Sequence, residues 1–140
     1  MKIFAILLST VMFISCSSNN GIKEEIGQWV NELEQLELEY SLWSETQFKI
    51  SVSDEDKDKL LKSYLGMTKS ELDEKFSNSD IMQQKAEELK LILEKYKKTN
   101  PTEEELISMS EFLNTKEKEY KKRVKDTKKA FEAELDSLSK

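Results

Sequence analysis

The 140-residue chain contains no histidine and a single cysteine. Without histidine it lacks the most common general base, proton shuttle and metal ligand of proteins. One cysteine excludes an internal disulfide framework and any zinc or iron–sulfur site that needs several cysteines. Three glycines and one proline provide few turn signals, which disfavours a strand-rich sandwich or barrel.

Sites for catalysis and for metals are also sparse. Arg123 is the one arginine among 22 basic residues, so little bidentate recognition of phosphate or carboxylate can be built. The carboxylates of Asp54, Glu55, Asp56 and Asp58 lack the glycine turn and terminal glutamate of a calcium loop. No glycine-rich phosphate loop, nucleophile elbow or metal motif is present. We therefore expect no metal, no cofactor and no enzymatic activity.

The N-terminal residues have the pattern of an export signal. Lys2 is followed by an uncharged, mostly apolar run over 3–14. As a helix this run would be about 18 Å long, well short of the roughly 30 Å hydrocarbon core of a bilayer. The pattern predicts a signal peptide over residues 1–15, with Ser15 as its last residue and Cys16 directly after it. An ordinary signal with an unmodified cysteine, or a buried apolar helix, are the alternatives.

A small residue followed by cysteine after such a run resembles the lipobox of bacterial lipoproteins. The resemblance implies cleavage between Ser15 and Cys16, lipidation of Cys16, and a flexible tether over 16–21. Phe13 stands where the family favours leucine, a relaxed pattern that occurs in spirochaetes. The implied location is the outer membrane or cell surface, with the exported chain held to the membrane by its lipid.

The lysine-rich composition and helical pattern are similar to those of small helical surface lipoproteins of spirochaetes. Several of those proteins bind host matrix or complement components. The resemblance implies a non-enzymatic surface lipoprotein that binds a host ligand: matrix, glycosaminoglycan or a complement component. The alternative is a structural or regulatory subunit of the cell envelope that docks a protein partner. Export and the net charge of −6 argue against nucleic acid as a partner.

An apolar seven-residue repeat opens the region after the tether. It predicts one long helix whose seam belongs to a bundle or coiled coil. The aromatic members of the seam belong either to a core or to a partner-binding face, and the same helix, 22–43, is a candidate homodimer interface. The seam comprises Ile22, Ile26, Trp29, Leu33, Leu36, Tyr40 and Trp43.

Capping signals predict where the later helices begin and end. Ser53 opens a second helix that Gly66 closes, and Thr68 with Glu71 forms a capping box for a short third one. A fourth helix is expected over about 80–98.

The last helix is expected to start at Asn100 as N-cap, with Pro101 at its first position. No glycine or proline follows, so it can run to residue 139, with Asn114 as the most favourable break. Residues 22–140 are therefore predicted to be all-α: a compact antiparallel bundle of four to five helices with a long C-terminal helix.

Charge is distributed unevenly along this domain. Residues 23–45 carry seven glutamates and one lysine, whereas residues 116–129 carry eight basic and three acidic residues. The basic segment has two interpretations: a binding site for a polyanion, or a solvated face that complements the acidic first helix. The candidate polyanion-binding residues are Lys116, Lys118, Lys121, Lys122, Arg123, Lys125, Lys128 and Lys129.

Overall fold

The computed structural model describes residues 19–77 and 80–140, and these contain five helices and no strands. They are α2 (Asn19–Phe48), α3 (Asp54–Leu65), α4 (Lys69–Ser77), α5 (Ile81–Lys97) and α6 (Glu103–Leu138). The all-α prediction and the long C-terminal helix are confirmed. Residues 1–18, including the expected signal peptide, Ser15 and Cys16, lie outside the described residues.

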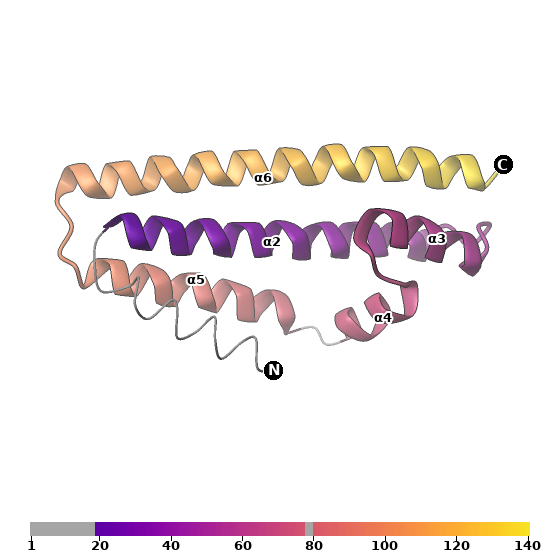
Figure 1. Ribbon diagram of the computed structural model, residues 1–140, viewed down its shortest axis with the longest axis horizontal. Helices are drawn as coiled ribbons and strands as arrows, with labels where there is room; N and C mark the ends of the chain where they lie inside the picture. Colours follow the sequence, from indigo (N-terminus) through magenta and orange to yellow (C-terminus); the bar gives the residue numbers. More distant parts are fainter. Residues whose placement is uncertain (1–18, 78–79) are drawn as a thin grey trace.

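The two long helices determine the elongated shape of the molecule (Figure 1). α2 has 30 residues and α6 has 36, which correspond to about 45 Å and 54 Å. They pack along each other and run parallel, whereas α5 returns antiparallel along the opposite side of α2 (Figure 1). Short links make helices that follow each other in the chain antiparallel. Because α5 runs back along α2 before α6 begins, α6 points the same way as α2.

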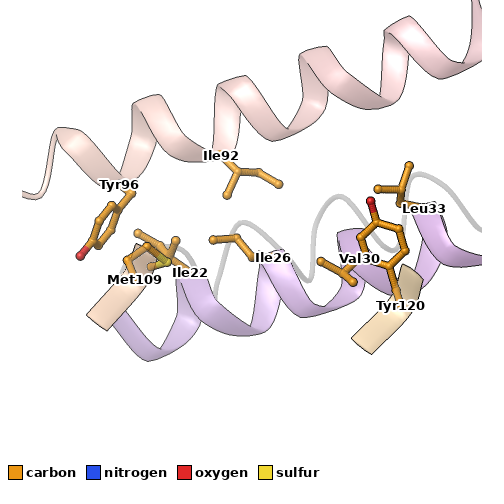
Figure 2. Packing of buried hydrophobic residues seen from close by; sticks show 8 residues of the cluster. All are labelled: Ile22, Ile26, Val30, Leu33, Ile92, Tyr96, Met109 and Tyr120. Atoms are coloured by element: carbon orange, nitrogen blue, oxygen red, sulfur yellow. The ribbon is translucent and has the colours of Figure 1, made fainter. Parts of the chain in front are cut away.

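Buried side chains form two separate clusters along the long axis. The first core lies between α2, α5 and the first half of α6 (Figure 2) and contains Ile22, Ile26, Val30, Leu33, Ile92, Tyr96, Met109 and Tyr120. The second core joins the end of α2 to α3, α4 and the last turns of α6, and contains Leu42, Val52, Leu60, Leu61, Leu72, Phe131 and Leu135. α2 and α6 contribute to both cores.

The buried face of α2 changes sides between the two cores. Its first half buries Ile22, Ile26 and Leu33, as the seven-residue repeat predicts, but its second half buries Leu42 and Thr46. At 3.6 residues per turn, the second set lies roughly half a turn from the first. The predicted seam therefore fails at Tyr40, which is exposed, and Trp43 is only half-buried beside the second core, because α5 covers one side of α2 whereas α3 and α6 enclose the second core from the other.

Most of the predicted helix ends are confirmed. The Ser53 hydroxyl accepts a hydrogen bond from the Asp56 amide (3.2 Å), and Gly66 closes α3 with a left-handed φ of 69°. The Thr68–Glu71 capping box is present, with reciprocal bonds of 2.8 and 3.2 Å. α2 begins at Asn19 and so includes the end of the segment expected to be a tether.

The predicted start of the last helix is wrong by two residues. Thr102 is the N-cap: its hydroxyl accepts from the Glu105 amide (3.2 Å), and the Glu105 carboxylate accepts from the Thr102 amide (3.0 Å). Asn100 instead adopts a left-handed φ of 51° in the link after α5. Asparagine tolerates that conformation, so the turn uses Asn100 and the neighbouring capping box starts the helix. α6 is continuous through Asn114.

Candidate functional site

All eight predicted polyanion-binding residues lie on α6, and the structure divides them into two groups. The first group makes ion pairs. Arg123 lies across from α2 and donates through Nε and Nη2 to the two carboxylate oxygens of Glu34, both at 2.7 Å. This hydrogen bonding raises the pKa of Arg123 above its usual value. Lys128 also reaches α2, with its Nζ 3.3 Å from Glu45.

Two further members of this group pair within α6. Lys121 forms an ion pair with Glu117, one turn earlier, and this hydrogen bond raises the pKa of Lys121. Lys116 lies 3.8 Å from the carboxylate of Glu119 and 5.7 Å from the centre of the Phe112 ring. These contacts, with those of Arg123 and Lys128, match the interpretation in which the basic segment complements acidic residues of the same bundle.

The second group has no such partner. Lys118, Lys122, Lys125 and Lys129 are exposed, and none forms an ion pair or hydrogen bond with another described residue. Their spacing of four, three and four residues places them in one row on the face of α6 opposite the buried Tyr120. We call these four residues the lysine stripe. It is about 17 Å long, since α6 rises 1.5 Å per residue.

Acidic residues surround the lysine stripe. Glu111 lies on the same row near its start, and Asp136, paired with Lys49, lies beyond its end. Glu119 and Asp126 lie along one side, and Glu117 and Glu132 along the other. The positive charge therefore forms a bounded row on a convex helix surface. Such a row attracts anions through point charges.

A groove between α2, α4 and α5 lies away from the lysine stripe and has a volume of about 490 Å³. Its charged side chains are paired with each other: Lys75 with Glu39, and Lys85 with Glu32 and with Glu88 (2.9 Å). Burial works to lower the pKa of Lys85, but its hydrogen bonds to the two glutamates outweigh this effect and raise the pKa. The groove therefore holds three carboxylates against two lysines, and its net charge of −1 does not favour an anionic ligand.

The acidic residues considered for metal binding serve local structure. Asp54, Glu55 and Asp56 occupy the first turn of α3, and the Asp58 carboxylate accepts a hydrogen bond from the Lys69 amide (2.8 Å). Within 19–77 and 80–140, no three histidine, cysteine or acidic residues converge on a site for a metal ion. In the same ranges, no helix combines the length and apolar character needed to cross a bilayer.

The aromatic side chains of the predicted seam have different roles. Trp29 packs against the first core and donates from Nε1 to the Lys85 carbonyl (2.8 Å). Trp43 packs against the second core and donates to Asp73 (2.7 Å). Tyr40 is 46% exposed, so it lies at the edge of the second core. A homodimer through helix 22–43 stays a prediction, and its seam residues Ile22 and Ile26 are packed within one chain.

Sequence reasoning missed an exposed apolar pair at the end of α2 and in the link to α3. Phe48 and Ile50 are 77% and 91% exposed, although the neighbouring Val52 is buried. The link is held to α6 by the ion pair between Lys49 and Asp136. The available signal was the loss of the seven-residue repeat after Trp43, which shows that these two apolar residues have no place on the helix seam.

Comparisons of the chain with protein-family models, with curated proteins and with solved structures find no match.

Proposed function

We propose that this protein is a non-enzymatic surface lipoprotein, anchored through lipid on Cys16, that binds an anionic host ligand through the lysine stripe. The observation that carries the proposal is the row of four exposed lysines without acidic partners in the described residues. Matrix glycosaminoglycan is the first candidate ligand, and an acidic complement component is another.

Stability does not account for the lysine stripe. Like charges three or four residues apart on a helix destabilise it by about 0.2–0.5 kcal/mol per pair. The pairs Lys118–Lys122, Lys122–Lys125 and Lys125–Lys129 all have this spacing, and the opposite-charge pairs Glu119–Lys122, Lys122–Asp126 and Asp126–Lys129 offset that cost. Elsewhere on α6 the chain alternates charge, as in Glu117–Lys121 and Lys128–Glu132. A row that brings no net gain in helix stability has a functional explanation if an anion binds there.

The proposed anchor leaves the lysine stripe accessible. α2 begins at Asn19, three residues after Cys16, so lipid on Cys16 would hold the start of α2 close to the bilayer. The start of α6 lies at the same end of the molecule (Figure 1). Lys118 is 15 residues further along α6 than Glu103, which is about 22 Å at the helical rise. The stripe therefore lies away from the membrane-proximal end.

Protease treatment of intact cells tests the location. The chain has many lysines for trypsin, so surface display predicts rapid loss of the protein while a periplasmic control protein stays intact. Protection of the protein until the outer membrane is broken would contradict host binding.

Binding to heparin tests the site. We expect the double variant Lys122→Glu/Lys125→Glu to lose most of its heparin affinity, and the affinity of the unaltered protein to fall steeply with salt. The matched control is Lys90→Glu/Lys97→Glu on α5, which changes the net charge equally at two exposed lysines without an ion pair in the described residues. Equal losses in both variants would show that net charge, and not the stripe, determines binding. Circular dichroism should show the same helix content in all three proteins.

The envelope-subunit alternative is favoured by one observation, the exposed pair Phe48 and Ile50 at the C-terminal end of α2, the end opposite its start at Asn19. Exposed apolar side chains on an ordered link are typical of protein contacts. This alternative predicts protection from protease on intact cells and an envelope protein that co-purifies with the chain but not with the Phe48→Ser/Ile50→Ser variant.

A further inference from the structure

We infer that the ligand of the lysine stripe is a flexible linear polyanion, a sulfated polysaccharide, that lies along the axis of α6 and contacts the four lysines in series. This inference rests on the proposed function and specifies its ligand class. It follows from the dimensions of the stripe, from the charges beside it and from the side chains that are absent around it.

The shape of the site excludes tight binding of a compact anion. The four ammonium groups project from successive turns of a convex helix, with axial steps of about 4.5–6 Å and a total length of about 17 Å. A small polyphosphate or a single sulfate can contact neighbouring lysines but cannot reach from Lys118 to Lys129. Lysine also offers point charges without the fork of arginine, so recognition depends on the spacing of charges along the ligand.

The flanking charges determine the direction of the ligand. A polyanion that crossed α6 on one side would pass the carboxylates of Glu119 and Asp126. On the other side it would meet Glu117 and Glu132, each already paired with a lysine. Neither side offers an unpaired positive charge on α6, whereas the helix axis offers four in series. The lengthwise path is the one that gains attraction at every step.

The lack of apolar surface favours a polysaccharide over an acidic protein. Protein interfaces depend on buried aromatic and apolar anchors within a polar rim. The exposed large hydrophobic residues of the described chain include Leu106, Ile107 and Leu138 on α6, but none between residues 108 and 137. Recognition at the stripe thus depends on charge, which suits a hydrophilic chain with regularly repeated anionic groups.

The test measures affinity of the full-length protein, purified from membranes in neutral detergent, for four probes. They are a heparin octasaccharide that is longer than the stripe, a heparin disaccharide that is shorter, inositol hexakisphosphate as a compact anion, and polyglutamate as an acidic peptide. We expect the octasaccharide to bind most tightly. Substitution of any one stripe lysine by glutamine should weaken it about two- to five-fold, as for an exposed ion pair.

Two variants distinguish a lengthwise ligand from other arrangements. Lys118→Gln/Lys129→Gln removes both ends of the stripe and should weaken the octasaccharide more than the disaccharide, which can still bind Lys122 and Lys125. The matched control is Lys90→Gln/Lys97→Gln on α5, which removes the same charge from two exposed lysines without an ion pair in the described residues and should change affinity less than two-fold.

The outcomes separate this inference from the function on which it rests. Octasaccharide affinity that is unchanged by Lys118→Gln/Lys129→Gln, or that is matched by inositol hexakisphosphate or polyglutamate, would overturn the lengthwise polysaccharide but keep an anion site on α6. Binding of none of the four probes, or full binding by Lys122→Glu/Lys125→Glu, would overturn the proposed function itself.

Discussion

The first and second cores share two helices but are covered from solvent by different kinds of helix. In the first core, long helices lie side by side and bury one aliphatic stripe of α2 against α5 and α6. Of its members, Ile26 alone is fully buried, and the Tyr96 hydroxyl donates to the Glu105 carbonyl (3.0 Å). In the second core, Leu42, Leu61, Leu72, Phe131 and Leu135 are all fully buried.

The difference shows what short, capped helices contribute. α3 has 12 residues and α4 has nine, too short for either to be stable alone. Their caps at Ser53, Gly66 and Thr68 fix the turns so that α3 and α4 cover the second core from two directions. The first core is covered by α5 alone, and its side chains are less completely buried than those of the second core. We therefore expect the second core to contribute more stability per residue.

Phe131→Ala should have the largest effect. Phe131 is fully buried in the second core and makes an edge contact with Tyr64, with ring centres 5.3 Å apart. Removing the ring leaves a cavity and should lower the free energy of unfolding by about 3–5 kcal/mol. Chemical denaturation followed by Trp43 fluorescence, in a Trp29→Phe background, measures this loss.

The same substitution tests whether the two cores unfold together. Because α2 and α6 pass through both, we expect Trp29 fluorescence, in a Trp43→Phe background, to report the same transition midpoint. A first core that survived after the Trp43 signal had changed would show that the two cores are independent units.

A second comparison tests the change of buried face on α2. Leu42→Ala should cost about 2–5 kcal/mol, because Leu42 is fully buried in the second core. Tyr40→Ala should cost no more than about 1.5 kcal/mol, since Tyr40 is 46% exposed and contributes mainly ring contacts to Trp43 and Phe76. Thermal unfolding measures both losses of stability. A larger loss for Tyr40→Ala than for Leu42→Ala would mean that the seven-residue seam stays buried along the whole of α2.

A smaller effect is expected at the link between α5 and α6. Thr102→Ala removes a capping hydrogen bond to Glu105 and should destabilise the fold by about 1 kcal/mol. Asn100→Gly should not destabilise it, because glycine adopts the left-handed φ of 51° without strain. Greater sensitivity at Asn100 in thermal unfolding would show that Asn100, and not Thr102, caps α6.

The smallest predicted effect is a pH dependence of the second core. Burial works to raise the pKa of Asp73, but hydrogen bonds from Trp43 and Lys69 outweigh it and lower the pKa below the ordinary 3.8. Ionised Asp73 therefore stabilises the fold above about pH 4, and this contribution is lost as the pH falls through the lowered pKa. The loss should stay below about 1 kcal/mol because Asp73 is partly exposed.

Denaturation at pH 6 and pH 3 measures this contribution. Asp73→Asn keeps an acceptor for Trp43 without the charge, so the stability difference between the variant and the unaltered protein should shrink at the lower pH. A difference that stayed constant between the two pH values would mean that the charge of Asp73 makes no contribution.

Short-range sequence signals were sufficient to predict most helix ends and the buried residues of α2 in the first core. Ser53, Gly66 and Thr68 act on atoms within four residues, so the sequence around them contains the whole interaction. The start of α6 was less certain by sequence, because Asn100 and Thr102 are both good caps. The choice depended on the left-handed turn that leads out of α5.

The candidate site required both kinds of information. The excess of lysine over 116–129 is visible in the sequence, but the division into paired and unpaired residues is not. Arg123 and Lys128 find Glu34 and Glu45, residues more than 80 positions away, because α2 and α6 run parallel. Among the eight basic residues, Lys118, Lys122, Lys125 and Lys129 are the ones without an ion pair in the described residues, and they form the lysine stripe.

The sequence by itself determined the helical class, the approximate extents of the helices and the apolar repeat of the first core, because short-range periodicity and capping encode them. Only the tertiary structure decided that α2 turns its buried face by roughly half a turn after Leu36, and that α2 and α6 run parallel. Both depend on which helix covers which side of α2. That choice is made by packing between residues far apart in the chain, for which one helix's own sequence contains no signal.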